Sequence, residues 1–176
     1  MARVLVTEPI AEDGLEVLRR EADVDVRHGL SHEALLSVIG DYDALIVRSE
    51  TQVTADVLAS AKALQVVGRA GSGVDNIDMQ AATRRGVVVV NAPEGNTIAA
   101  AEHTIGLMLA LARHIPAAEA SLRSGAWQRS KFIGVELRGK TLGLVGLGRT
   151  GAEVARRARG LEMNVTAYDE WVGPER

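Results

Sequence analysis

A glycine-rich turn between a strand-like run and a helical pattern constrains this chain more than any other feature. The run Thr141–Val145 is apolar and has the length of a strand, and glycines follow at 146, 148 and 151. In such a turn the first glycine allows the tight bend, the second lets a pyrophosphate approach the backbone, and the third lets the helix pack against the strand. The N–H groups at the start of the helix can then hold phosphates.

The residues after this turn complete a strand–helix–strand unit. Apolar residues recur at helical spacing, and a second apolar run, Val165–Tyr168, ends at the acid Asp169. This context favours dinucleotide binding over an ordinary strand–helix turn. The cofactor-binding residues that we predict are Gly146, Gly148, Arg149, Thr150, Gly151 and Asp169.

Asp169 also indicates which dinucleotide is bound. A carboxylate at the end of the second strand accepts hydrogen bonds from the adenosine ribose hydroxyls and repels a 2′-phosphate. No arginine follows Asp169 before Arg176, so the cation that usually binds a 2′-phosphate is missing from this segment. The sequence therefore favours NAD over NADP, and the alternative is a surface aspartate that only closes a turn.

Composition narrows the class of protein. With 47% hydrophobic and 24% charged residues, the chain is typical of a globular protein. A net charge of −3 gives no general attraction to nucleic acid or to an anionic membrane. The absence of cysteine excludes disulfides and thiolate chemistry, and no sequence motif indicates a metal site. The N-terminus has the pattern of a strand rather than of a signal peptide, which predicts a cytoplasmic protein.

A long apolar segment, Thr97–Ile115, has about the length of a membrane span. Glu102, His103 and Arg113 interrupt it, and these polar groups would be costly in lipid. We therefore expect a buried helix between two domains or two subunits, with a kink or break at Pro116.

Strand-like runs alternate with helical patterns along nearly the whole chain, which predicts a parallel α/β fold. We expect a flavodoxin-like, doubly wound domain over residues 1–95 and the first half of a Rossmann dinucleotide-binding domain over residues 96–176. A Rossmann sheet needs more strands than this second part supplies, so the sequence indicates the N-terminal portion of a longer protein. The expected strands are Val4–Thr7, Val24–Arg27, Ala44–Arg48, Val66–Arg69, Val87–Asn91, Thr141–Val145 and Val165–Tyr168.

With these features the chain resembles the D-isomer-specific 2-hydroxyacid dehydrogenases over essentially its whole length. The segments that carry the resemblance are Leu45–Ser49, Val67–Asp78, Asn91–Thr97, Ala101–His103, Gly125–Gly139 and the glycine turn through Asp169. The resemblance implies oxidation of 3-phosphoglycerate to 3-phosphohydroxypyruvate with NAD, the first step of serine biosynthesis. Thr150 and Glu170 stand where the family often has isoleucine and proline, and neither change removes a required group.

The family's catalytic arginine, glutamate and histidine all lie beyond residue 176. The resemblance therefore assigns no catalytic residue to this chain, and we expect the 176 residues alone to be inactive.

The substrate side is expected at the ends of two strands and at the start of the second domain. From the residues alone, the small-residue segment Arg69–Val74 fits a backbone cradle for a carboxylate and an ordinary turn equally well. The resemblance places the substrate carboxylate there and favours arginines at strand ends as substrate contacts, although such arginines are also common as solvated or ion-paired groups. The predicted substrate-binding residues are Arg48, Arg69, Gly71, Ser72, Gly73 and Asn96, the last also a candidate N-cap of the long helix.

Alternative functions stay open at this point. Another member of the family, such as a glyoxylate or hydroxypyruvate reductase, would share the same motifs. The family also resembles NADH-sensing transcriptional co-repressors, in which dinucleotide binding matters more than turnover. We expect a small phosphorylated 2-hydroxy acid as substrate, neither a nucleic acid nor a membrane as partner, and a homodimer or higher homo-oligomer through residues 97–135.

Overall fold

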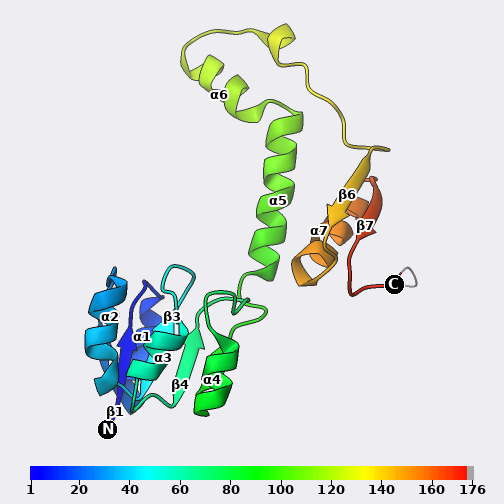
Figure 1. Cartoon of the computed structure of the whole chain (residues 1–176). Helices are drawn as coiled ribbons and strands as arrows, with labels where there is room; N and C mark the ends of the chain where they lie inside the picture. The colour runs from blue at the N-terminus through cyan, green and yellow to red at the C-terminus, as the bar shows by residue number, and fades with distance from the viewer. Residues whose placement is uncertain (174–176) are drawn as a thin grey trace. The chain divides into compact units, whose positions relative to one another are not determined.

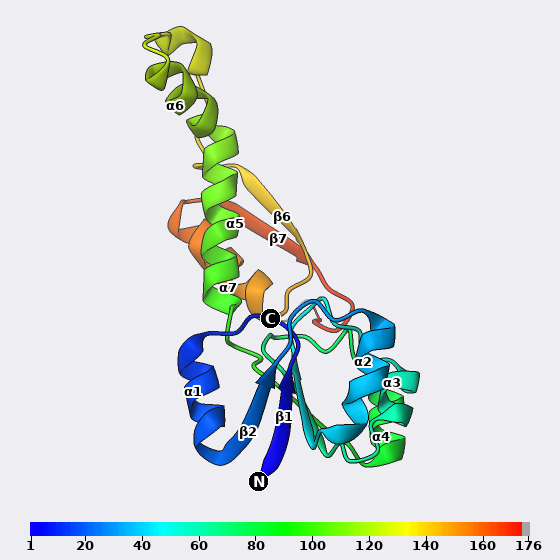
Figure 2. The same ribbon diagram turned by 90° about the vertical axis from the view of Figure 1, so that its left-hand side faces the viewer.

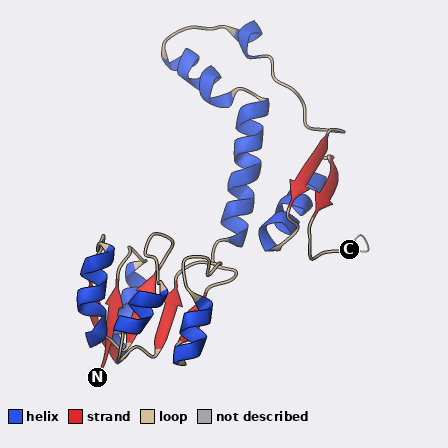
Figure 3. Cartoon of the chain, viewed as in Figure 1, coloured by secondary structure: helices blue, strands red, loops and turns tan. Residues whose placement is uncertain are grey.

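The computed structural model describes residues 1–173, which form two compact units, the first spanning Met1–Gly95 and the second beginning at Asn96 (Figures 1 and 3). Each unit has its own parallel sheet. The predicted α/β class is thus confirmed.

The first unit is built on a five-stranded sheet in which all strands run parallel, in the order β2-β1-β3-β4-β5. This is the flavodoxin-like order, in which the sequence of strands reverses direction between β1 and β3. The strands are β1 (Ala2–Val6), β2 (Ala22–Val26), β3 (Ala44–Val47), β4 (Val66–Arg69) and β5 (Val88–Asn91).

Helices cover both faces of this sheet (Figure 2). The helix α1 (Glu12–Glu21) lies on one face, and α2 (His32–Val38), α3 (Ala55–Ser60) and α4 (Met79–Arg85) lie on the other, with a short 3-10 turn, η1 (Ile39–Asp41), after α2. Side chains alternate between the faces along each strand, so Val4 and Val6 pack towards α1 while Leu5 packs into the larger core.

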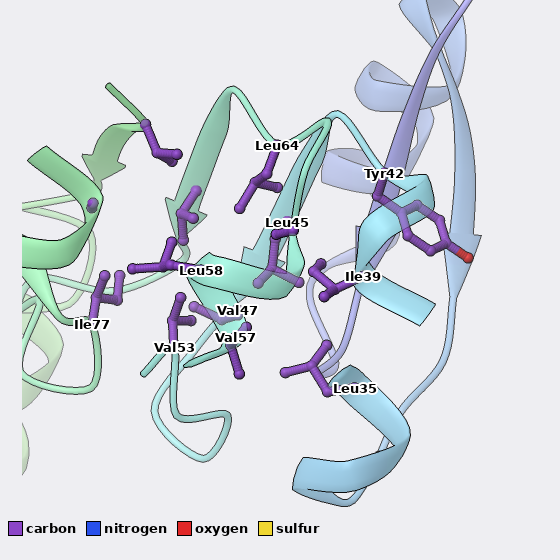
Figure 4. Close-up of a cluster of buried hydrophobic side chains, with 14 of the residues drawn as sticks. Leu35, Ile39, Tyr42, Leu45, Val47, Val53, Val57, Leu58, Leu64 and Ile77 are labelled. Atoms are coloured by element: carbon purple, nitrogen blue, oxygen red, sulfur yellow. The ribbon is translucent and has the colours of Figure 1, made fainter. Parts of the chain in front are cut away.

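The larger core lies between the sheet and α2 to α4 (Figure 4). Leu45 and Val47 point into it from β3, and Ile39 and Leu58 meet them from the helical layer. Val67 of β4 belongs to the same core. All five side chains are fully buried. This packing fixes where the carboxyl ends of the strands lie, and therefore where their loops emerge.

Local signals in the sequence set the ends of the helices. Ser31 and Asp78 accept hydrogen bonds from the N–H groups of Ala34 and Ala81, as expected of N-caps. Gly86 ends α4 in the left-handed conformation, at φ 68°. Thr54 does not cap α3 with its side chain, because its hydroxyl bonds the carboxylate of Asp56 instead.

The second unit begins with two helices, α5 (Thr97–Ala112) and α6 (Ile115–Arg123), and a 3-10 turn, η2 (Arg129–Phe132). The break between the helices falls at His114, which adopts φ 53°, and a proline follows in the first turn of α6. Within residues 1–173 no helix combines the length and the apolar character needed to cross a membrane.

A strand–helix–strand unit follows, formed by β6 (Thr141–Val145), α7 (Arg149–Gly160) and β7 (Asn164–Tyr168). The two strands pair in parallel. α7 packs against α5, where Arg157 bridges to Glu102 at 3.3 Å and also pairs with Glu153 one turn away on its own helix.

The core of the first unit generates a stability prediction. Replacing the fully buried Leu45 by alanine leaves a cavity beneath α3, so Leu45→Ala should lower the free energy of unfolding by about 2–5 kcal/mol. Val17→Ala, on the exposed face of α1, should change it by less than about 0.5 kcal/mol. Urea unfolding followed by circular dichroism measures both variants, and equal losses would contradict this description of the core.

Candidate functional site

The loops after β1 and β3 meet at the point where the strand order reverses, the usual ligand-binding edge of such sheets. Glu8 follows β1, and its side chain crosses to the loop after β3. Its Oε1 accepts hydrogen bonds from the N–H groups of Arg48 (2.8 Å) and Thr51 (3.0 Å), and its Oε2 accepts from Ser49 and Glu50 (both 3.0 Å). One carboxylate thus binds four consecutive N–H groups.

The Glu8 carboxylate is charged although it is only 4% exposed. Burial alone would raise its pKa, but the N–H groups of Glu50, Thr51 and Arg48 outweigh burial and lower the pKa to about 2. An unfolded glutamate titrates near 4.5. These bonds therefore stabilise the fold fully above about pH 4.5, and that stabilisation is lost as the pH falls through about 2.

The carbonyl groups of the same loop are also held. The side-chain amide of Asn76 donates to the carbonyls of Arg48 (3.0 Å) and Thr51 (2.7 Å), and Nε of Arg69 donates to the carbonyl of Arg48 at 2.9 Å. The Arg48 guanidinium is exposed, and its one hydrogen bond within residues 1–173 is to the carbonyl of Pro9, at 3.4 Å. The backbone of Arg48 is anchored while its charged end stays available.

Arg69 forms an ion pair within the first unit, and its role in substrate binding stays a prediction. Its guanidinium pairs with Asp75 at 2.5 Å, and its side chain is only 10% exposed. The pair lies against the small-residue loop, since a Cβ on Gly73 would approach Arg69 Nη1 and Asp75 Oδ1 to 2.7 Å. The Asp75 side chain is 80% exposed, so the ion pair borders solvent at this loop.

The loop above this ion pair has the features of an anion cradle. Within the described residues, the N–H groups of Ser72, Gly73 and Val74 bind no protein acceptor, while Asn91 holds the loop by donating to the Ser72 carbonyl at 2.8 Å. Successive free N–H groups of this kind attract a carboxylate or phosphate. The expected substrate residues Gly71, Ser72 and Gly73 therefore lie together, at the strand edge that also carries Arg48.

Asn96 begins the second unit at the N-cap position of α5. Its backbone carbonyl accepts from the N–H of Ala100 at 2.9 Å, but its side chain makes no capping hydrogen bond. Its amide is exposed. Asn96 is therefore the N-cap residue of α5, without a side-chain capping bond, and substrate binding by Asn96 stays a prediction.

In the second unit, the glycine turn has the geometry that a dinucleotide requires. Gly146 adopts φ 100°, a Cβ on Gly148 would meet nothing within 4 Å, and a Cβ on Gly151 would clash with the carbonyl oxygen of Gly146. Only glycine fits positions 146 and 151, and the space over Gly148 is open. α7 begins at once after this turn, at Arg149 and Thr150, so its first N–H groups face the same region.

Asp169 lies beside this turn, at the carboxyl end of β7. Its Oδ2 accepts from the N–H of Leu147 at 2.6 Å and its Oδ1 from the N–H of Trp171 at 2.8 Å. The N–H groups of Leu147 and Trp171 lower the pKa of its carboxyl, so Asp169 is charged near neutral pH. A carboxylate offers about four acceptor positions, so roughly two remain for the hydroxyls of a ribose.

Asp169 also borders a pocket with a volume of about 450 Å³. Apolar side chains of α7 and β7 form part of its wall, and Arg159 contributes a cation. The pocket is lined by Leu147, Ala155, Arg159, Val165, Ala167, Tyr168, Asp169, Val172 and Gly173. This lining combines apolar, cationic and anionic side chains beside the glycine turn.

Two of these residues are not predicted from the sequence. Glu8 precedes the loop that it binds by forty residues, so no local pattern reveals the contact. Arg159 precedes Asp169 in the chain, whereas a cation that binds a 2′-phosphate is expected after it, and only the place of Arg159 near the end of α7 indicates that it faces β7. No cluster suited to a metal ion occurs within residues 1–173.

Comparison with known proteins agrees with this geometry. The family model for the catalytic domain of D-isomer specific 2-hydroxyacid dehydrogenases matches residues 4–172. A protein named D-3-phosphoglycerate dehydrogenase from Archaeoglobus fulgidus is 56% identical over 175 residues, which cover 99% of this chain and 33% of that protein. The chain thus spans about a third of the length of this curated relative.

Solved structures show the same similarity. A crystal structure of a protein from Thermus thermophilus superposes with a TM-score of 0.89 at 38% identity, covering 98% of this chain and 57% of that one. A 3-phosphoglycerate dehydrogenase from Entamoeba histolytica, crystallised with NAD+, superposes with a TM-score of 0.78 at 28% identity, covering 99% and 56%. The chain therefore belongs to the family of D-isomer specific 2-hydroxyacid dehydrogenases.

Proposed function

We propose that the full-length protein oxidises D-3-phosphoglycerate to 3-phosphohydroxypyruvate with NAD, and so begins serine biosynthesis in the cytoplasm. The observation that carries this proposal is the glycine turn with Asp169 beside it, in a chain whose relatives at 50–56% identity bear the name of that enzyme. The choice of 3-phosphoglycerate over other 2-hydroxy acids rests on those names and on the exposed Arg48 guanidinium of the first unit.

The two units would divide the work. We assign substrate binding to residues 1–95, where the Arg48 guanidinium and the N–H groups of residues 72–74 are available to the anionic groups of a phosphorylated acid. We assign NAD binding to the unit that begins at Asn96, where the turn would hold the pyrophosphate and Asp169 the ribose. NAD, when bound, accepts a hydride from the carbon that carries the substrate hydroxyl.

Asp169 would select NAD in two ways. Its charged carboxylate accepts hydrogen bonds from both ribose hydroxyls, and it repels the phosphate that NADP carries at one of them. Arg159, in the same pocket, is a cation that could attract such a phosphate once the carboxylate is gone. The preference for NAD therefore depends on Asp169.

The full-length protein tests the proposal. It should reduce NAD with 3-phosphoglycerate and turn over unphosphorylated 2-hydroxy acids poorly. Hydrogen bonds to a charged acceptor contribute about 1.5–3 kcal/mol, so Asp169→Ala should lower the ratio of kcat/KM for NAD to that for NADP by about tenfold or more. Glu170→Ala, the neighbouring exposed acid, should leave the ratio unchanged.

Three outcomes would oppose this proposal. Saturable NADH binding without turnover would favour a dinucleotide sensor. Better turnover of glyoxylate or hydroxypyruvate would favour a different reductase of the family. An unchanged ratio of kcat/KM for NAD to that for NADP in Asp169→Ala would show that the carboxylate does not set the coenzyme preference.

A pair of glycine variants on α7 tests the turn itself. Gly151→Ala would clash with the carbonyl of Gly146 and shift the start of the helix, whereas Gly160→Ala meets nothing within 4 Å. A backbone shift of this kind costs about 1–3 kcal/mol, so NADH binding should weaken by roughly tenfold in Gly151→Ala alone. Calorimetric titration measures both dissociation constants, and equal values would contradict the dinucleotide role of the turn.

We also propose that the protein forms a homodimer through residues 97–135. Large apolar side chains gather on this segment and stay exposed, including Leu111 at 79%, Trp127 at 74% and Ile133 at 76%. Exposed apolar patches on this scale mark interaction surfaces. A second copy of the chain is the occupant that fits best, because the family resemblance implies self-association through this same segment.

A charge placed in this segment tests the dimer. Leu111→Glu should convert the full-length protein from dimer to monomer, since the carboxylate would be buried without a partner in the interface. Val17→Glu, at a 60% exposed site on α1 in the other unit, should leave the mass unchanged. Sedimentation velocity at micromolar concentration measures the mass, and a monomeric wild type or a dimeric Leu111→Glu would refute the proposal.

A further inference from the structure

The first sheet offers two neighbouring groups of N–H donors at its carboxyl edge, and the chain itself fills one of them. The loop after β3 gives four N–H groups to Glu8, at 2.8 to 3.0 Å. The loop after β4 leaves the N–H groups of residues 72–74 without a protein acceptor in the described chain. The two loops are joined, because Arg69 Nε donates to the Arg48 carbonyl.

Glu8 occupies the place that a bound anion takes in many open α/β sheets. Anions bind where successive backbone N–H groups converge at the strand ends beside the reversal point. Here that place holds a carboxylate of the protein, buried to 4% exposure. A substrate anion is therefore excluded from the first group of donors, both by occupancy and by like charge.

The rest of the loop is fixed around this contact. Asn76 binds its first and last carbonyls, and the hydroxyls of Thr7 and Thr51 lie 2.9 Å apart. Arg48 itself has its N–H bound by Glu8 and its carbonyl bound by Asn76 and Arg69. Its exposed guanidinium has no carboxylate within ion-pair distance in the part of the chain that is described.

We propose that Glu8 is a positioning residue for the substrate: as an internal anion it orders the 48–51 loop, presents the Arg48 guanidinium, and directs the substrate's anionic groups to the open N–H groups of residues 72–74. This inference rests on the function proposed above. Glu8 does not touch the reacting atoms, and its effect is on substrate binding rather than on NAD.

The Glu8→Gln variant tests this role with little change of shape. The amide oxygen can still accept, but the amide NH₂ would face two N–H donors, so the loop should loosen on one side. Asp25→Asn is the matched control, because Asp25 is also a bonded carboxylate of the first sheet but binds Tyr42 and Arg27 rather than the loop. Both variants are made in the full-length protein.

Steady-state kinetics and NADH titration separate positioning from general damage. A loop displaced by about 1 Å can lower efficiency by up to about a hundredfold, so Glu8→Gln should raise the KM for 3-phosphoglycerate at least tenfold. The dissociation constant of Glu8→Gln for NADH should stay within about twofold of the wild-type value. In Asp25→Asn, both the KM for 3-phosphoglycerate and the dissociation constant for NADH should stay within about twofold of wild type. An unchanged KM in Glu8→Gln, an equal rise in Asp25→Asn, or a parallel loss of NADH binding would overturn the proposal.

Amide hydrogen exchange provides a measurement that does not depend on activity or on the variant folding. In the wild-type protein the N–H groups of residues 48–51 should be protected at least about tenfold although the loop is exposed. Exchange at the rate of an open loop would overturn the proposal. Protected amides in a protein that neither binds NADH nor oxidises 3-phosphoglycerate would instead contradict the proposed function and leave the ordering of the loop by Glu8 intact.

Discussion

Hydrogen bonds from backbone N–H groups to carboxylates hold the candidate site in place in both units. Parallel strands end at one edge of a sheet, and the loops that leave this edge expose N–H groups that need an acceptor. In the first unit Glu8 accepts four of them, and in the second Asp169 accepts those of Leu147 and Trp171. Loops that would otherwise be mobile are thereby ordered before any ligand arrives.

Because the loops are ordered in advance, they affect how tightly a ligand binds. A ligand that meets a preformed loop does not have to supply the free energy of fixing it, so more of its interaction energy appears as affinity. The carboxylates of Glu8 and Asp169 also determine which backbone N–H groups remain available to a ligand. Glu8 closes the 48–51 loop to anions, the N–H groups of residues 72–74 stay available, and Asp169 keeps acceptor positions for hydroxyl groups.

Much of this architecture could be predicted from sequence because the signals are local. The glycine spacing specifies the turn at 146–151, and short apolar runs between helical patterns specify a parallel sheet. The strands β4 and β6 have the expected bounds, and the others differ from the expected ones by a residue or two at their ends, as for β1, which begins at Ala2. The long apolar segment divides at His114, just before Pro116, because the chain turns there through a left-handed residue.

The hydrogen bonds and ion pairs that position the candidate site join residues that lie apart in the sequence. Glu8 reaches a loop forty residues later in the sequence, and the amide of Asn76 bonds the carbonyls of Arg48 and Thr51 in that same loop. Arg69 is another example, since its ion pair with Asp75 is seen only once the loop after β4 is folded, and its role in substrate binding stays a prediction. Such pairings depend on how the elements pack, and a single sequence does not encode them in any short pattern.

Preordered N–H groups and the carboxylates that bind their neighbours should select the ligands of this protein. A crystal structure of the full-length protein with NAD and 3-phosphoglycerate would show whether they do. We expect the ribose hydroxyls on Asp169, an anionic group of the substrate on the N–H groups of residues 72–74 with Arg48 beside it, and Glu8 still bonded to the 48–51 loop. A substrate anion bound to the N–H groups of residues 48–51, with Glu8 displaced, would contradict this expectation.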